Sequence, residues 1–288
     1  MDLDPLILRE IVVRALREDI GTGDITTQAI VSDNYVTIGF IRPKEPGVVA
    51  GLDVAREVFL QLSPDISFQP RVKDGERVVP GQLLARVEGD ARAILSGERV
   101  ALNFLQRMSG IATRVACMAG LIAGYRAKLA DTRKTTPGLR VLERYAVRVG
   151  GGYNHRFGLY DAILIKDNHI KVAGSISEAV SRAKFRAPHT MGIEVEVESL
   201  ESLEEAINAG ANVIMLDNMD LDSMKKAVEL AAGRVLLEAS GTVSEENIKD
   251  VAETGVDLIS VGSLTHSVKA LDISLDVGEM KTIAGVII

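Results

Sequence analysis

The stretch Ile193-Glu194-Val195-Glu196-Val197 decides the fold class of this 288-residue chain, together with Val213-Ile214-Met215-Leu216-Asp217. Both are short apolar-rich runs of the kind that parallel sheets bury, and each precedes a helical pattern, at 200–208 and 221–231. Further strand-like runs lie at 128–132, 162–165, 235–237 and 258–261, and further helical patterns at 177–184 and 244–253, the last opening at an expected N-cap, Ser244. About six strand–helix units predict an α/β fold with an incomplete parallel barrel.

The first hundred residues have a different pattern, typical of antiparallel strands. Residues 35–41 alternate between apolar and polar side chains, and an Asp74-Gly75 turn within residues 72–84 predicts a hairpin. We therefore expect an N-terminal α+β open-sandwich domain. The hairpin also resembles half of a biotinyl or lipoyl carrier, but Lys73 precedes the turn instead of occupying its tip, so we interpret the segment as scaffold.

A long helix is expected from about Ser96 to Lys128, because apolar residues recur there near the spacing of one helix face. These residues are Ala101, Leu105, Met108, Ala112 and Val115. Gly110 and Gly120 are candidate points for a break or a bend. The predicted domains are residues 1–112 for the sandwich and 113–269 for the catalytic barrel, with the tail 270–288 pairing back onto the sandwich.

Composition limits the classes of partner. The formal net charge is −7, only 4% of residues are aromatic and Trp is absent, which argues against a nucleic-acid partner. Cys117 is the single cysteine, so a disulfide framework is excluded, and we expect it in the core. The N-terminus lacks the pattern of a signal peptide and no run reaches membrane-spanning length, which predicts no membrane association and a cytoplasmic location.

Positive charge is concentrated between Arg126 and Lys171, where ten Lys or Arg stand against four Asp or Glu. Working groups of a parallel barrel lie at the carboxyl ends of its strands. The polar residues found there are Thr132-Arg133-Lys134, Lys166-Asp167, Glu196, Asp217-Asn218, Glu238-Ala239-Ser240-Gly241 and Gly262-Ser263. A helix cap explains Asn218 about as well as a functional role does. The set as a whole predicts a binding site for a small, highly charged anion.

Three carboxylates, on Glu194, Glu196 and Glu198, share one face of their strand because they alternate with valines. Such acids need a metal or cationic partners in a barrel interior. Glu196 and Asp217 on neighbouring strands would suit Mg²⁺, which prefers hard oxygen ligands and also binds substrate phosphates. An ion pair with Lys166 or Lys134 is an equally good explanation of either acid taken singly.

Two other groups of residues point to anions. Arg133, Lys134, His155 and Arg156 offer the forked and point charges that bind carboxylates. The glycine and hydroxyl loops at Ser240-Gly241-Thr242 and Gly262-Ser263-Leu264, with His266 close by, would let backbone N–H groups approach a phosphate. By contrast, no strand precedes Gly21-Thr22-Gly23, which rules out a dinucleotide fingerprint there.

Successive motifs of the chain resemble those of the quinolinate phosphoribosyltransferases, in the type II phosphoribosyltransferase family. The similarity runs over nearly the whole chain. The matching segments are 18–27, 98–103, 131–137, 154–156, 166–169, 194–197 and 238–241. The resemblance implies transfer of phosphoribose from phosphoribosyl pyrophosphate to quinolinate with decarboxylation, giving nicotinate mononucleotide, pyrophosphate and carbon dioxide. It implies Mg²⁺ and no organic cofactor.

The resemblance also implies roles for residues. Lys134, Lys166, Glu196 and Asp217 would be catalytic, the last two through Mg²⁺. Substrates would contact these four and Arg99, Thr132, Arg133, His155, Arg156, Ser240, Gly241, Thr242, Gly262, Ser263, Leu264 and His266. Arg99 would reach the site of a partner subunit across a homodimer interface, although an intrachain ion pair explains this residue as well on sequence alone.

Two alternatives remain open from the sequence. One is a related phosphoribosyltransferase for another planar acid, such as the molybdenum-locus paralogues of the family, which loss of the arginine cluster would have favoured. The other is a non-catalytic carrier built on the N-terminal domain, which would have no use for the polar barrel mouth.

Overall fold

The computed structural model describes residues 3–278 and 281–282, and the chain divides into two compact units. The first consists of the described residues within Met1–Arg114, Thr136–Gly150 and Ser267–Ile288, and the second of Val115–Thr135 and Gly151–His266. The division at Arg114 lies two residues beyond the predicted one. Residues 136–150, inside the predicted barrel range, belong to the first unit. Residues 1–2, 279–280 and 283–288 of the predicted N-terminal domain and tail lie outside the described residues.

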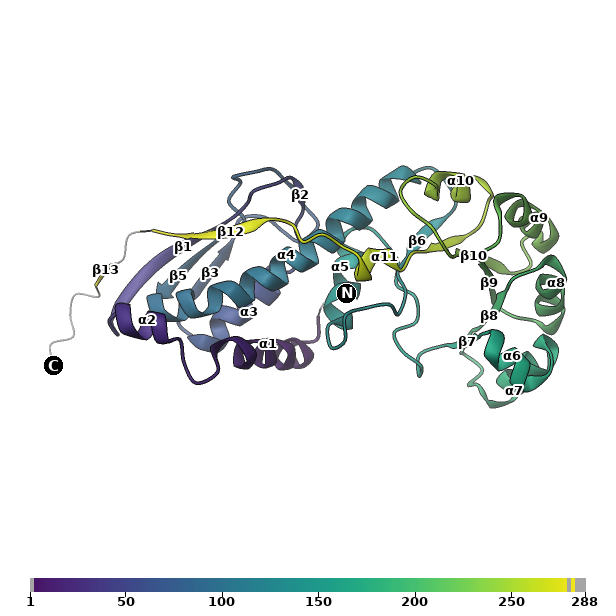
Figure 1. Cartoon of the computed structure of the whole chain (residues 1–288), viewed down its shortest axis with the longest axis horizontal. Coiled ribbons are helices and arrows are strands. Elements are labelled where there is room, and N and C mark those ends of the chain that lie inside the picture. The colour runs from purple at the N-terminus through teal and green to yellow at the C-terminus, as the bar shows by residue number, and fades with distance from the viewer. Residues whose placement is uncertain (1–2, 279–280, 283–288) are drawn as a thin grey trace. The chain divides into compact units, whose positions relative to one another are not determined.

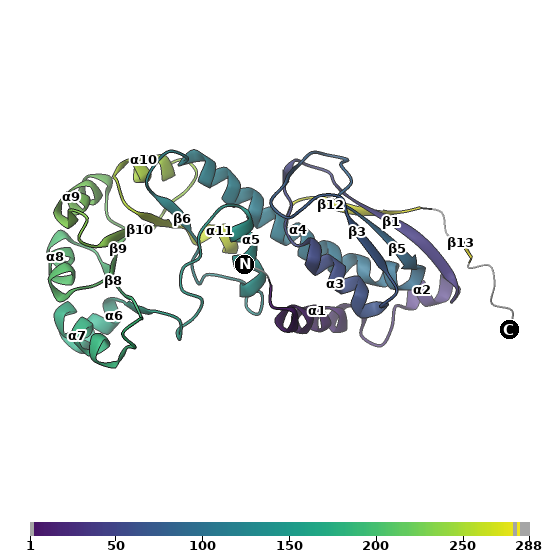
Figure 2. The same cartoon turned by 180° about the vertical axis from the view of Figure 1, so that it is seen from behind.

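The first unit is built on an antiparallel sheet with the strand order β12-β1-β5-β3. These strands are β1 (Tyr35–Pro43), β3 (Ser67–Pro70), β5 (Ala85–Asp90) and β12 (Ile273–Val277), and the short β13 (Lys281–Thr282) also pairs with β1. Alternate residues of β1 are buried, as the sequence pattern predicted. The chain's tail therefore completes the N-terminal sheet through β12, which the two views show running along β1 (Figure 1, Figure 2).

Helices complete the first unit. They are α1 (Pro5–Ile20), α2 (Ile25–Ile30), α3 (Leu52–Leu62), the part of α4 (Ala91–Leu121) up to Arg114, and α5 (Arg140–Val149). The apolar face predicted for the long helix is buried throughout. The helix begins five residues earlier than expected and continues through Gly110, but ends directly after Gly120. Gly110 is needed for space, because a Cβ there would lie 2.3 Å from the Lys269 carbonyl oxygen.

The predicted hairpin around Asp74-Gly75 is wrong. The strand that follows this turn, β4 (Arg77–Val78), pairs with β2 (Gly47–Val48) and not with the residues before the turn. Asp74 has a different role: its carboxylate accepts hydrogen bonds from the backbone N–H groups of Gly51 (2.7 Å) and Leu52 (3.1 Å), at the start of α3. A remote aspartate thus satisfies donors that the helix leaves open.

The second unit contains a six-stranded sheet in the order β6-β11-β10-β9-β8-β7, and every pair of neighbours is parallel. The strands are β6 (Lys128–Ala130), β7 (Ile163–Ile165), β8 (Ile193–Val197), β9 (Val213–Asp217), β10 (Leu236–Ser240) and β11 (Leu258–Ser260). Within the described residues β6 and β7 do not pair with each other, so the curved sheet remains open on one side (Figure 1). The predicted incomplete parallel barrel is confirmed.

Helices line the outside of this sheet in both views (Figure 1, Figure 2). They are α6 (Asp167–Ala173), α7 (Ile176–Arg186), α8 (Leu200–Ala209), α9 (Leu221–Ala231) and α10 (Ile248–Glu253). The short α11 (Ser263–His266) follows β11 and lies away from this outer row (Figure 1). Three of these helices have a capping side chain at the N-terminus. Ser175, Ser199 and Asp220 accept backbone N–H hydrogen bonds at the N-caps of α7, α8 and α9.

Three expectations on single residues need correction. Helix α10 begins at Ile248 with Asn247 as its N-cap, and Ser244 lies in the preceding turn. Cys117 is exposed and not in the core, because it lies on the outer side of α4 between buried Val115 and Met118. Asn218 does not cap α9, since Asp220 does. Among the described residues, no helix is both long and apolar enough to cross a membrane.

Candidate active site

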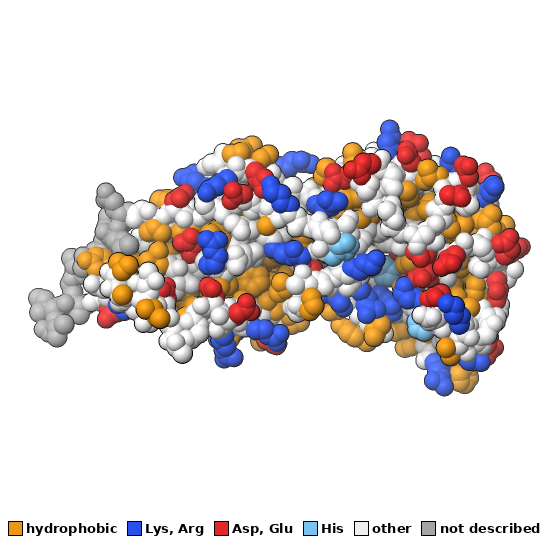
Figure 3. Space-filling model, in the orientation of Figure 1, with side chains coloured by type: hydrophobic (Ala, Val, Ile, Leu, Met, Phe, Trp, Pro, Cys, Tyr) orange, Lys and Arg blue, Asp and Glu red, His pale blue; other side chains and the backbone are white. Residues whose placement is uncertain are grey.

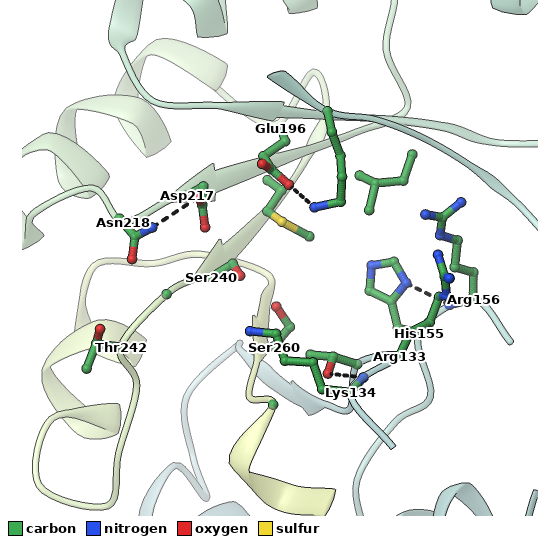
Figure 4. Close-up of a pocket in the computed structure, with 16 residues that line it drawn as sticks. Arg133, Lys134, His155, Arg156, Glu196, Asp217, Asn218, Ser240, Thr242 and Ser260 are labelled. Atoms are coloured by element: carbon green, nitrogen blue, oxygen red, sulfur yellow. Dashed lines mark hydrogen bonds and ion pairs between the residues drawn. The ribbon is translucent and has the colours of Figure 1, made fainter. Parts of the chain in front are cut away.

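A pocket of about 520 Å³ lies at the carboxyl ends of the six parallel strands. Its lining combines four Lys or Arg residues with two acids, and Figure 4 shows these side chains converging from different strand ends. The lining residues are Thr132, Arg133, Lys134, His155, Arg156, Leu164, Lys166, Glu196, Met215, Asp217, Asn218, Ser240, Gly241, Thr242, Ser260 and Gly262. On the face drawn in Figure 3, Lys and Arg side chains gather with histidine over this unit, next to acidic side chains. The pocket is suited to a small polyanion.

Two guanidinium groups form one side of the pocket. Arg156 donates from NH1 to the carbonyl oxygen of Ala162 (3.0 Å), which fixes the direction of its side chain. Burial, and then the neighbouring charge of Arg133, lower the pKa of Arg156. Two like charges held together in a partly buried place favour an anion between them, because an anion offsets their repulsion.

His155 is held on both ring nitrogens. Its Nδ1 accepts the backbone N–H of Arg156 (2.7 Å), and its Nε2 lies 3.1 Å from Glu194 Oε2 and 3.6 Å from Glu238 Oε1. The buried Asp131 accepts from the backbone N–H of His155 (2.7 Å). The ring therefore lines the pocket in one fixed orientation, with its hydrogen-bonding atoms already occupied.

The acids of the opposite side face one another. Lys166 Nζ lies 2.5 Å from Glu196 Oε2, so the expected ion pair is present. Burial, and then the charge of Glu196, raise the pKa of Asp217, and Asn218 donates to Asp217 Oδ2 (3.0 Å). A carboxylate whose pKa is raised by a neighbouring carboxylate, as that of Asp217 is by Glu196, fits a hard divalent cation, because a cation between the two groups would remove the repulsion.

The two glycine loops are closely packed. Gly241 has φ +132°, and a Cβ there would lie 2.5 Å from Asn218 Oδ1. A Cβ on Gly262 would lie 2.9 Å from Lys134 Cδ and 3.3 Å from His266 Nε2. Both positions need glycine so that side chains from other strand ends can approach the backbone.

Most predicted site residues meet in this pocket, and four do not line it. Ser263, Leu264 and His266 form most of the short α11; Leu264 is fully buried, and His266 lies against Gly262. Arg99 lies on α4 in the first unit. The pocket adds Leu164, Met215, Asn218 and Ser260 to the predicted set. Strand periodicity could have found three of these, because residues two positions apart on a strand point to the same face. Leu164, Met215 and Ser260 each precede a predicted site residue by two positions.

Thr265 is a further residue that the sequence did not single out. Its hydroxyl donates to the carbonyl oxygen of Lys134 (2.7 Å), although the side chain itself is fully buried. It ties the loop after β6 to α11. No local pattern marks this contact, since it joins residues from opposite ends of the second unit's sequence.

The fold and pocket define a class: an α/β-barrel enzyme with a pocket at its strand ends whose lining suits a compact anion. Models of the quinolinate phosphoribosyl transferase C-terminal and N-terminal domains match residues 111–276 and 24–109. The chain belongs to this family.

Individual relatives agree with the family models. The chain is 47% identical over 275 residues to the probable nicotinate-nucleotide pyrophosphorylase (carboxylating) of Bacillus subtilis, covering 96% of this chain and 95% of that one. It is 47% identical to the Mycobacterium leprae enzyme of that name, covering 93% and 96%. The crystal structure of NadC from Streptococcus pyogenes superposes with a TM-score of 0.94 at 44% identity, covering 98% of this chain and 99% of that one.

Proposed function

We propose that this enzyme transfers the phosphoribosyl group of phosphoribosyl pyrophosphate to quinolinate and releases carbon dioxide, forming nicotinate mononucleotide and pyrophosphate for NAD biosynthesis. The observation that supports this most strongly is the division of one pocket into two halves. Arginines occupy one half, and facing carboxylates with glycine loops occupy the other. This division matches a planar diacid meeting a phosphorylated sugar. The chain is also 47% identical to the pyrophosphorylases of Bacillus subtilis and Mycobacterium leprae over nearly their full length.

The arginine half would bind quinolinate. Arg133, Arg156 and Lys134 would hold its two carboxylates by charge-assisted hydrogen bonds. His155 would provide a fixed wall, since its ring nitrogens are engaged by Arg156, Glu194 and Glu238.

The acidic half would bind phosphoribosyl pyrophosphate. Glu196 and Asp217 would hold Mg²⁺, which supplies charge neutralisation to the pyrophosphate when bound. Lys166, beside Glu196, would face the pyrophosphate or the ring, and Thr132 would contact the substrates between the two halves. The loops at Ser240-Gly241-Thr242 and Gly262-Ser263-Leu264, with His266, would contact the 5′-phosphate. Leu264 would do so through its backbone only, because its side chain is buried.

The chemistry asks mainly for positioning. The pyridine nitrogen of quinolinate is the nucleophile: it forms a bond to the ribose carbon as the bond to pyrophosphate breaks, so no general base is required. The alkylated ring then stabilises the electron pair left when the adjacent carboxylate leaves as carbon dioxide, and that ring carbon takes up a proton. No organic cofactor is needed in this scheme.

We also propose that the active enzyme is a homodimer in which Arg99 completes the partner's pocket. Arg99 lies on α4 of the first unit and does not line the pocket of its own chain. Inactive Arg99→Ala and Glu196→Ala variants, unfolded together and refolded as a mixture, should recover roughly a quarter of parental activity, because one pocket of each mixed dimer would be intact. Recovery near zero with mixed dimers present would exclude an active site shared between subunits.

A cytoplasmic location also stays a prediction.

The proposed activity is tested by incubating the protein with Mg²⁺, phosphoribosyl pyrophosphate and ¹⁴C-carboxyl-labelled quinolinate and measuring released carbon dioxide. Label release should require all three and should fail in Asp217→Asn at limiting Mg²⁺, with Asp222→Asn, an exposed acid on α9, as the matched control. Release with another pyridine acid but not with quinolinate would favour a family member of different specificity.

A further inference from the structure

The layer of side chains beneath the pocket contains an acid pair that the proposed reaction does not use. Glu194 on β8 and Glu238 on β10 are 9% and 2% exposed, and both carboxylates reach the same atom, His155 Nε2. One ligand atom from each of these three residues lies within 4.8 Å of the others. Two buried acids at one imidazole nitrogen need either a positive charge or a proton to be stable.

Burial disfavours a charge on the His155 ring, and the hydrogen bond to Glu194 and the charge of Glu238 raise the pKa of the ring. The contact at Nδ1 opposes the second proton that a charged ring would need. The backbone N–H of Arg156 points at Nδ1, so this nitrogen is an acceptor and carries no proton. The neutral ring has one N–H, on Nε2, and the nearer acceptor for it is Glu194 at 3.1 Å, against 3.6 Å for Glu238. Glu238 is left without a cation of its own in the cluster.

Two buried oxygens point to where a proton belongs. Among the described residues, neither Glu194 Oε1 nor Glu238 Oε1 has a hydrogen-bond partner. If both were ionised, two buried acceptors would lack any donor, which is costly. A proton on Glu238 lowers the number of buried ionised acceptors and removes the like-charge repulsion between the two acids at the same time.

We propose that Glu238 is a positioning residue that works as a neutral carboxylic acid, holding the His155 ring beneath the carboxylate-binding arginines and keeping this part of the pocket positive. In support, burial and then the charge of Glu194 raise the pKa of Glu238 to about 7. The other groups that face it are His155, Asp131 and Ser260. The inference rests on the proposed binding of quinolinate by Arg133 and Arg156.

A consequence for substrate binding follows. Above pH 7 Glu238 ionises and adds a negative charge under the place where a dianion binds. The dissociation constant for quinolinate should then rise with pH, by at most about tenfold per pH unit, and binding at pH 7.5 should take up a fraction of a proton. In Glu238→Gln, a permanently neutral isostere, the affinity should stay near the value of the parent at pH 6 and lose both the pH slope and the proton uptake.

Calorimetry of quinolinate binding in two buffers of different ionisation enthalpy, between pH 6 and 8.5, measures the affinity, its dependence on pH and the proton uptake. Glu229→Gln makes the same chemical change at an exposed acid on α9 and should behave as the parent does. A Glu238→Gln variant that folds but keeps the parental pH slope would overturn the proposal. So would a Glu238→Gln variant that loses quinolinate affinity at pH 6.

A second measurement needs no substrate. In protein labelled with ¹³C at glutamate carboxyl carbons, one buried resonance should titrate near pH 7. The resonance missing in Glu238→Gln assigns it. Full ionisation of every glutamate by pH 6 would overturn the inference even if quinolinate turnover were observed. Failure of turnover alone would leave this titration intact and would contradict only the proposed function.

Discussion

The two sheets of this protein use the same polar residue types for different purposes. In the antiparallel first unit, neighbouring strands end on opposite edges, so polar ends do not gather. Asp4, Asp24 and Asp74 there accept backbone N–H bonds at helix starts. In the parallel second unit all six strands end on the same edge, and their polar ends form one pocket. Acids cap helices in both units, as Asp220 does for α9, but only the parallel strands bring acids such as Glu196 and Asp217 together in a pocket.

The comparison predicts that the core of the first unit contributes stability without touching the pocket. Phe59 is fully buried and packs near Phe68, with ring centroids 6.3 Å apart. Phe59→Ala should lower the free energy of unfolding by about 3–5 kcal/mol because it leaves a cavity. Urea unfolding measures this. Quinolinate affinity at a temperature well below unfolding should not change.

Phe185→Ala is the matched control for this core substitution, since Phe185 is 90% exposed on α7. Its effect should stay within about 0.5 kcal/mol. Equal destabilisation by the two substitutions would mean that burial does not distinguish them, contrary to the structure.

The opposite behaviour is expected at the strand ends. Arg156→Ala should remove charge-assisted hydrogen bonds worth about 1.5–3 kcal/mol and weaken quinolinate binding by roughly 10- to 100-fold. Calorimetry measures the affinity, and urea unfolding should show a stability close to the parent's. Arg182→Ala, which removes an exposed arginine paired with Glu178 on α7, should leave the affinity unchanged. Equal affinity in the two variants would exclude Arg156 from the carboxylate site.

The smallest loss of stability should come from replacing Asp24. This residue lies in one of the segments that resemble the family, but in the structure it caps α2 in the first unit. Its carboxylate accepts from the hydroxyl and the backbone N–H of Thr27, and these bonds lower its pKa. Asp24→Ala should cost about 0.5–2 kcal/mol, as the loss of a helix cap does.

The pH dependence gives the sign of this contribution. A lowered pKa in the folded state means that the stabilisation is complete above the unfolded pKa, about 3.9, and is lost as the pH falls through the lower folded value. Unfolding curves of parent and variant should therefore differ fully at pH 6 and converge below pH 4. A gap that widened on acidification would contradict the assigned hydrogen bonds.

Local pattern alone determined most of the second unit and the identity of its strand ends. The run at 193–197 became β8 with the same bounds, and the run at 213–216 became β9, which also includes Asp217, because a short strand pattern and the helix behind it are encoded within one segment. Period-two alternation likewise placed Glu194 and Glu196 on one face. The residues that line the pocket could be predicted because all parallel strands present their carboxyl ends together.

Tertiary structure decided which of these residues meet. The pairing of β4 with β2, the cap that Asp74 gives to α3, and the tie from Thr265 to Lys134 join segments whose sequences carry no mark of each other. The placement of His155 between Glu194 and Glu238 depends on strand order and register, which bring β8 and β10 to either side of β9. The raised pKa of Glu238 follows from that placement, because a carboxyl group responds to the charges and burial around it in space and not to its neighbours along the chain.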